Sequence, residues 1–289
     1  MGKTLTRGRA VVLAMLVCTG LGAGGVVAVQ AAASGGTPSI PSAPKPGVKP
    51  ARPSLRPMTA TGSVSPQVLA TNVHCGQVLI ASVTMNGDLF CSGPGLILNK
   101  NSITLNLNGH AIVGPGGNFD TGVEVNATSD IVENGVIAGF YNGVIVNGTT
   151  DTVTKIRATY NKNLGIADLG SKTKLTTNVA YSNVVGFVVA GTGSAVSGNH
   201  AVSNTGNGFN VVSGTGIILT SNVANGNGGY GVYDGAFVTT LTGTSANFNV
   251  YDGIYVNDAS AIDGGTNTAK GNDYGAGATP EQCFNIVCA

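Results

Sequence analysis

Two aspartates and two cations are the residues of this sequence whose types and spacing could carry out chemistry. Asp130 and Asp151 each follow a repeated glycine by eight residues, so neighbouring repeat units would bring them together. A pair of carboxylates about 5–10 Å apart can hydrolyse a glycosidic bond. Lys155 and Arg157 alternate along one predicted strand and should share a face, where a base could take a proton from an acidic sugar. These four residues are the candidates for catalysis.

The two aspartates also have a purely structural explanation. Lys172 lies seven residues after the next repeated glycine, so it could continue the stack of Asp130 and Asp151 as a column of ion pairs. No two acidic residues are adjacent anywhere in the chain. The sequence favours the structural explanation over the catalytic one.

A second group of residues could bind an anionic ligand without reacting with it. Cations concentrate between positions 143 and 185, although the chain from position 67 onward holds 7 basic and 13 acidic residues. A local excess of positive charge attracts acidic polymers, and tyrosine rings beside it can stack on sugars. The ligand-binding candidates are Tyr160, Lys172, Lys174 and Tyr181; the two tyrosines lie close to the repeated alanines of adjacent units and are expected to be neighbours. Ordinary solvated side chains are the alternative explanation.

All these residues lie in a body that repeats. A glycine followed by an apolar residue recurs every 21 to 23 residues, at Gly122, Gly143, Gly165, Gly186, Gly208, Gly231 and Gly253. An alanine recurs in phase with it, at Ala138, Ala158, Ala180, Ala201, Ala224, Ala246 and Ala269. Two marks that keep one period over seven units are typical of a solenoid.

Short strands and polar turns within each unit predict a parallel β-helix. No unit contains ten residues of helical periodicity, which excludes leucine-rich, ankyrin and tetratricopeptide arrays. We predict an all-β, right-handed parallel β-helix solenoid of about eight coils of roughly 22 residues, since parallel crossovers are nearly always right-handed. The repeated glycines are expected to supply positive φ at tight corners, and the alanines to fill a narrow interior.

Asparagines two residues before the repeated alanines are expected to stack as a structural ladder. Asn178, Asn199, Asn222 and Asn267 occupy this position. Each amide would bond to the next amide and to the backbone. Further asparagines follow most of the alanines, three residues later in four units and one residue later at Asn225 and Asn247.

Four cysteines flank the repeats: Cys75, Cys91, Cys283 and Cys288. An even number in an exported chain is typical of disulfides, and four cysteines allow three pairings. The simplest pairing is local, Cys75 with Cys91 and Cys283 with Cys288, and would staple a cap onto each end of the column. Metal binding is the alternative, but no histidine lies nearby at ligand spacing.

The N-terminal part of the chain differs from the repeats. Residues 1–33 are predicted to be an export signal, because basic residues precede an apolar run and an alanine triplet follows it. An uncleaved membrane anchor is the alternative. Residues 34–66 are rich in proline and carry four cations, as expected for a stiff basic linker. The β-helix domain is assigned to residues 67–289, with no membrane contact expected once the signal is cleaved.

The start of the body carries a family resemblance. Its features are the Cys75…Cys91 frame and the segment Leu105–Ile112, which reads LNLNGHAI. They resemble the opening of exported bacterial right-handed β-helix repeat proteins of the pectate-lyase-like superfamily. That superfamily includes lyases, hydrolases, epimerases, tailspikes and adhesins, so the resemblance implies a fold and a carbohydrate ligand but no particular reaction. The Asn-Thr-Asp, Asp-Asp, Gly-His-Gly and Arg-Ile-Lys segments of polygalacturonase-like hydrolases are missing.

The sequence therefore predicts a secreted or envelope-associated β-helix with a glycan-binding or structural role, and a polysaccharide or cell-wall glycan as its partner. The alternative is a lyase or hydrolase of an acidic polysaccharide, and only a lyase would require Ca²⁺. No other cofactor, no metal site and no nucleic-acid partner are expected, because the body is acidic. An ice- or surface-binding solenoid would need Thr-x-Thr rows on consecutive coils, but Thr152–Thr154 and Thr240–Thr242 are far apart.

Overall fold

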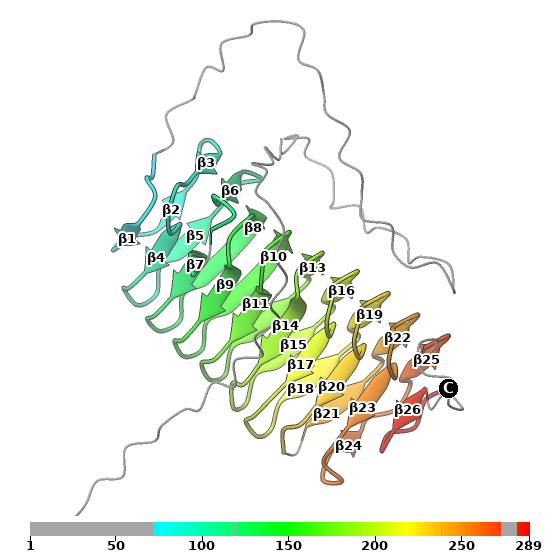
Figure 1. The fold of residues 1–289 in the computed structure, drawn as a ribbon. Coiled ribbons are helices and arrows are strands. Elements are labelled where there is room, and N and C mark those ends of the chain that lie inside the picture. Colours follow the sequence, from blue (N-terminus) through cyan, green and yellow to red (C-terminus); the bar gives the residue numbers. More distant parts are fainter. Residues whose placement is uncertain (1–71, 118, 238, 273–281) are drawn as a thin grey trace, which may run out of the picture.

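The computed structural model describes residues 72–117, 119–237, 239–272 and 282–289. The predicted export signal and linker lie outside these residues. Every regular element of the described part is a β-strand, and the strands stack into one elongated column (Figure 1). In this part of the chain there is no helix long and apolar enough to cross a membrane.

One side of the column is a ten-stranded sheet in which each coil of the chain adds one parallel strand. In hydrogen-bonding order, its strands are β1 (Gln77–Leu79), β4 (Leu96–Leu98), β7 (Thr121–Val125), β9 (Asn142–Val146), β11 (Leu164–Asp168), β14 (Val185–Val189), β17 (Phe209–Val211), β20 (Val232–Asp234), β23 (Ile254–Val256) and β26 (Cys283–Phe284). Ten strands make about nine turns, one more than predicted. The prediction counted coils by the repeated glycine, which first occurs at Gly122 in β7 and so misses the coils of β1 and β4.

The other side is a 16-stranded sheet made of two rows of strands that meet at a bend. The first row contains β2 (Val83–Thr84), β5 (Thr104–Asn106), β12 (Lys174–Thr176), β15 (Ala195–Ser197), β18 (Ile218–Thr220), β21 (Thr240–Thr242) and β24 (Ile262–Asp263). The second contains β3 (Leu89–Phe90), β6 (Ala111–Val113), β13 (Val179–Tyr181), β16 (His200–Val202), β19 (Val223–Asn225), β22 (Ser245–Asn247) and β25 (Thr268–Lys270). Two long strands, β8 (Ile131–Ala138) and β10 (Thr152–Thr159), pair with both rows.

The strand register aligns the repeat marks across coils. Ala158 pairs with Ala180, which pairs with Ala201, and all three are buried. In the ten-stranded sheet, Phe187 and Phe209 stack in the interior with ring centroids 4.7 Å apart. These pairings confirm the predicted all-β parallel solenoid. Right-handed winding remains the expectation from the crossover rule.

The repeated glycines meet a steric requirement that differs from the predicted one. None of them has a positive φ, so the expectation of tight left-handed corners at these positions is wrong. A Cβ on Gly165 would lie 2.5 Å from the carbonyl oxygen of Gly186 and 2.9 Å from Nδ2 of Asn183. Adjacent coils approach too closely here for any side chain. A left-handed residue before this glycine is Tyr160, five residues earlier, with a φ of 55°.

The asparagines before the repeated alanines form a buried amide ladder. Nδ2 of Asn178 donates to Oδ1 of Asn199 at 3.0 Å, and Nδ2 of Asn199 donates to Oδ1 of Asn222 at 3.1 Å. Thr244 takes the next position, and its backbone N–H donates to Oδ1 of Asn267 at 3.0 Å. The amides also donate to backbone carbonyls of the preceding coil, so few polar atoms in this row lack a partner.

A second, longer ladder lies three residues after the repeated alanines and was not predicted as a ladder. Its members are Asn161, Asn183, Asn204, Asn227, Asn249 and Asn272, and it ends on Gln282. Asn225 and Asn247 drew attention in the sequence, but Asn227 and Asn249, two residues further on, keep the period. All six ladder asparagines are buried.

Disulfides join the cysteines in the local pairing, Cys75 to Cys91 and Cys283 to Cys288. Cys91 follows β3 directly and is buried, so the first bond holds the N-terminal segment against the first coils. Cys283 begins β26, so the second bond lies at the last strand of the ten-stranded sheet.

Candidate functional site

An arginine and two tyrosines meet where β10 and β13 end. The guanidinium carbon of Arg157 lies 5.5 Å from the ring centroid of Tyr181. The ring of Tyr160 meets that of Tyr181 edge-on, with centroids 5.7 Å apart. We call Arg157, Tyr160 and Tyr181 the arginine–tyrosine patch. The neighbourhood of the two tyrosines was predicted from the sequence, and Arg157 joins them.

The backbone holds this patch in place. Thr159 pairs with Tyr181 across the strands, and its Oγ1 donates to the carbonyl oxygen of Tyr181 at 3.0 Å. The N–H of Tyr160 donates to the same carbonyl at 3.2 Å. Directly after it comes Asn161, the first rung of the longer ladder. The left-handed φ of Tyr160 turns its ring outward, where 40% of the residue is exposed.

The patch carries positive charge that no acidic side chain neutralises. Among the described residues, no carboxylate lies within 4.0 Å of Arg157. Lys162 lies two residues after Tyr160 and is exposed. Burial raises the pKa of Tyr160, Tyr181 raises it further and Arg157 opposes both effects, so the phenol keeps its proton at neutral pH. A planar guanidinium beside aromatic rings suits a ligand that has both a carboxylate or sulfate and a sugar ring.

Lys155 and Arg157 flank the buried Ile156 in β10; Lys155 is exposed and Arg157 half-buried. Lys155 has a φ of 52° and lies at the bend of β10, directly after the half-buried Thr154, so the alternation of inward and outward side chains breaks between Thr154 and Lys155. That Lys155 and Arg157 share one face stays a prediction.

The four ligand-binding candidates separate into two pairs on the two rows of the 16-stranded sheet. Lys174 pairs with Thr152 at the start of β10, whereas Tyr181 pairs with Thr159 at its end. Lys172 is exposed in the turn before β12. The bend of β10 at Lys155 lies between the two pairs, so these lysines and the arginine–tyrosine patch do not form one site.

Asp130 and Asp151 stack as predicted but face the interior. Their exposed fractions are 1% and 0%. The N–H of Asp130 donates to Oδ1 of Asp151 at 2.8 Å, and the N–H of Ile103 donates to Oδ1 of Asp130 at 2.9 Å. A polymer on the surface could not reach either carboxylate. Thr173, not Lys172, continues this stack, so the predicted ion-pair column is absent from the described residues.

Burial dominates the electrostatics of these acids. It raises the pKa of Asp151 to about 6, and the nearby carboxylates of Asp130 and Asp168 add to the effect, while backbone N–H donors oppose it. Burial likewise raises the pKa of Asp168 and that of Asp130. The described residues contain no group of three or more His, Cys, Asp or Glu side chains placed to hold a metal ion.

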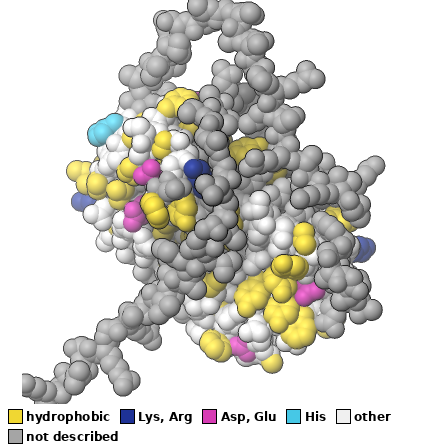
Figure 2. Space-filling view, viewed as in Figure 1, with side chains coloured by type: hydrophobic (Ala, Val, Ile, Leu, Met, Phe, Trp, Pro, Cys, Tyr) yellow, Lys and Arg dark blue, Asp and Glu magenta, His cyan; other side chains and the backbone are white. Residues whose placement is uncertain are grey.

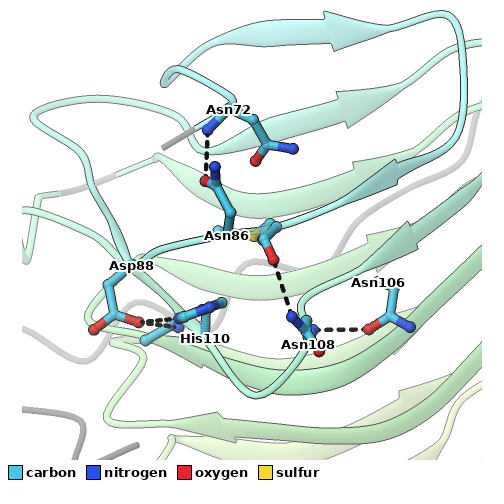
Figure 3. Close-up of polar contacts among 8 residues, drawn as sticks. Asn72, Asn86, Asp88, Asn106, Asn108 and His110 are labelled. Atoms are coloured by element: carbon cyan, nitrogen blue, oxygen red, sulfur yellow. Dashed lines mark hydrogen bonds and ion pairs between the residues drawn. The ribbon is translucent and has the colours of Figure 1, made fainter. Parts of the chain in front are cut away.

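Near the N-terminal end, Asp88 and His110 form the one ion pair of the described residues (Figure 3). Nδ1 of His110 lies 3.3 Å from Oδ1 of Asp88, which also accepts from the N–H of Ala111 at 2.9 Å. Nδ2 of Asn108 donates to the carbonyl of Met85 at 3.3 Å. These contacts tie the first coil to the second, so this polar group is part of the cap.

Five aromatic residues near the C-terminal end form a cluster that sequence reasoning did not single out. Its members, which we call the aromatic cluster, are Tyr230, Tyr233, Tyr251, Tyr255 and Phe284. The rings of Tyr233, Tyr255 and Phe284 are nearly parallel, at 5° and 9°. Tyr230 lies across them, with its centroid 5.2 to 5.5 Å from three other rings. Figure 2 shows hydrophobic side chains gathered toward this end of the column, with an Asp or Glu side chain beside them.

A periodic signal for this cluster exists in the sequence. Tyr233 and Tyr255 each follow a repeated glycine by two residues, and register pairs them with each other and Tyr255 with Phe284. Tyr230 and Tyr251 lie one and two residues before those glycines. Aligning the units on the glycine would have placed these tyrosines side by side.

Fold and surface together define a parallel β-helix protein with two exposed aromatic regions. No family model and no curated protein matches the chain. Among solved structures, pectate lyase Pel9A is 16% identical, with a TM-score of 0.43 over 72% of this chain and 74% of that one. An alginate lyase from Paenibacillus sp. str. FPU-7 is 14% identical, with a TM-score of 0.44 over 75% and 93%. At these values neither match carries an argument about this chain.

Proposed function

We propose that this protein is a non-catalytic binder of an acidic polysaccharide, exported to the cell surface or its surroundings. The observation that supports this most directly is the arginine–tyrosine patch. Arg157 lies against an aromatic ring with no carboxylate partner among the described residues. Such a cation is available to an anionic ligand, and Tyr160 and Tyr181 offer rings beside it. Two disulfides favour an oxidising location.

The buried aspartates favour binding over catalysis. A glycosidase needs one carboxyl group to protonate the leaving oxygen and a second to act on the sugar carbon or on water. Asp130 and Asp151 are enclosed by the column, and six residues of chain separate Asp151 from Arg157. A glycosidase on this surface would thus have to use carboxylates other than Asp130 and Asp151.

A binding and turnover assay on the purified protein tests this function. The probes are polygalacturonate and alginate as acidic polymers and a neutral β-glucan as the control polymer. We expect the acidic polymers to bind without unsaturated products or new reducing ends. Arg157→Ala should weaken binding at least tenfold, whereas Lys174→Ala, at the far end of the same sheet, should change it less than twofold. Equal losses of affinity in both variants would mean that the polymer binds through nonspecific charge attraction and not at the arginine–tyrosine patch. Turnover of any polymer would contradict the non-catalytic role.

A further inference from the structure

The aromatic cluster is not required by the fold. On the outer face of the ten-stranded sheet, Val188 and Asn210 occupy the same register position as Tyr233, Tyr255 and Phe284. The coils that carry Val188 and Asn210 stack as regularly as those that carry the rings. Coil stacking therefore does not require large aromatic rings at these half-buried positions, and the rings are free to serve another purpose.

The cluster has an electrostatic setting opposite to that of the arginine–tyrosine patch. From position 175 to position 269 the sequence contains no lysine or arginine. Asp252 lies next to Tyr251, and its carbonyl oxygen accepts from the N–H of Gly231 at 3.1 Å, which places it beside Tyr230. Its charge also acts on Tyr230, whose pKa is raised first by burial and then by Asp252. Negative charge thus borders the rings.

Ring faces and a carboxylate together recognise a cation that carries apolar surface. The π-face of an aromatic ring is negative and attracts ammonium groups, and a nearby carboxylate strengthens this attraction. An acidic sugar would be repelled at the same place. A neutral sugar could stack on the rings but would gain nothing from Asp252.

We propose that the aromatic cluster is a second binding site, specific for saccharides with free amino groups. Tyr230, Tyr233 and Tyr255 provide the rings, and Asp252 provides the countercharge. Tyr251, with 50% of its surface exposed, forms the outer rim. This site is independent of the proposed acidic-polysaccharide site, because it lies on the other sheet and selects the opposite charge.

Titration of the intact protein with glucosamine oligomers tests the proposal, with N-acetylglucosamine oligomers of equal length as the matched control ligand. Binding is measured by calorimetry at pH 5.5, where the amines are charged. We expect the glucosamine oligomers to bind at least tenfold more tightly than the acetylated ones. Tyr230→Leu and Asp252→Asn should each weaken this binding at least fivefold, and Arg157→Ala should leave it unchanged.

The outcomes separate this site from the proposed function. Equal affinity for both oligomers, or no binding of either, would overturn the proposal. So would loss of binding in Arg157→Ala, because the ligand would then occupy the other patch. If Tyr230→Leu fails to fold, as judged by its circular dichroism, Asp252→Asn decides the matter, since it keeps the size of the side chain. Failure with polygalacturonate and alginate would affect only the acidic-polysaccharide site.

Discussion

Inner and outer positions of the same strands change in different ways along the column. Inside the ten-stranded sheet, the row from Val144 to Val232 keeps large, fully buried apolar side chains in every coil. One residue further along each strand, the outer row passes from the half-buried Ile145 and Val188 in the middle coils to Tyr233 and Tyr255 near the C-terminal end. Packing between coils restricts the inner row to apolar side chains, whereas it places no such restriction on the residue types of the outer row. Variation on the outer row is therefore where ligand binding can be located.

The largest expected effect comes from removing one aromatic ring from the inner row and, for comparison, one from the outer row. Phe187→Ala should lower the free energy of unfolding by about 3–5 kcal/mol, because it leaves a cavity beside Phe209. Tyr255→Leu should lower it by about 0.5–1.5 kcal/mol, because only ring contacts at the surface are lost. Urea unfolding followed by circular dichroism measures both. Similar losses would mean that the outer rings are structural.

Breaking a ladder should have the next largest effect. In Asn204→Ala, both the N–H and Nδ2 of Asn183 lose their shared acceptor inside the column. We expect a loss of about 2–4 kcal/mol, since each buried donor without a partner costs about 1–3 kcal/mol. Asn210→Ala, on the outer face of the same coil, is the control and should cost less than about 0.5 kcal/mol. A small loss at both positions would show that water can replace the ladder bond.

The buried aspartates should make the protein more stable in acid, a smaller effect than the two above. The pKa of Asp151 is about 6 in the folded protein and 3.8 as an ordinary carboxyl group, so the folded state binds this proton more tightly. The resulting stabilisation is complete below about pH 4 and is lost as the pH rises through 6. Asp151→Asn should reduce the fall in stability between pH 4 and 7 by on the order of 1–2 kcal/mol.

Thermal melting at a series of pH values measures this effect. Asp263→Asn, at an exposed position near the C-terminal end, is the matched control. An unchanged pH dependence in Asp151→Asn would mean that other groups, among them Asp234, whose pKa burial also raises to about 6, account for the acid stabilisation.

Features that repeat could be predicted from the sequence, because the same residue type recurs at the same position in successive coils. The alanine row and the Asn178–Asn199–Asn222 ladder follow from spacing alone. The local disulfide pairing was the simplest of three possibilities, and it is the one observed. Features that depend on the orientation within one coil could not. Asp130 and Asp151 were aligned correctly, but periodicity does not say whether an aligned row points inward or outward.

The candidate site was predicted only in part for the same reason. Tyr160 and Tyr181 were expected to be neighbours, and they are. The bend at Lys155 was not predicted, because a single left-handed residue within a strand leaves no mark in an alternating pattern. The aromatic cluster brings together residues from three coils, and its last ring, Phe284, lies beyond the final repeated glycine.

The regular stacking of coils also fixes distances along the axis of the column. Each coil adds one strand spacing of about 4.8 Å, so sequence distance converts directly into distance along the axis. Three coils separate the strand that follows Tyr160 from the one that holds Tyr233, a rise of about 15 Å. Gain or loss of one whole coil would shift the two surfaces by a fixed step and leave the chemistry of each intact. Evolution could thus match the separation of the surfaces to the length of a polymer repeat without redesigning either one.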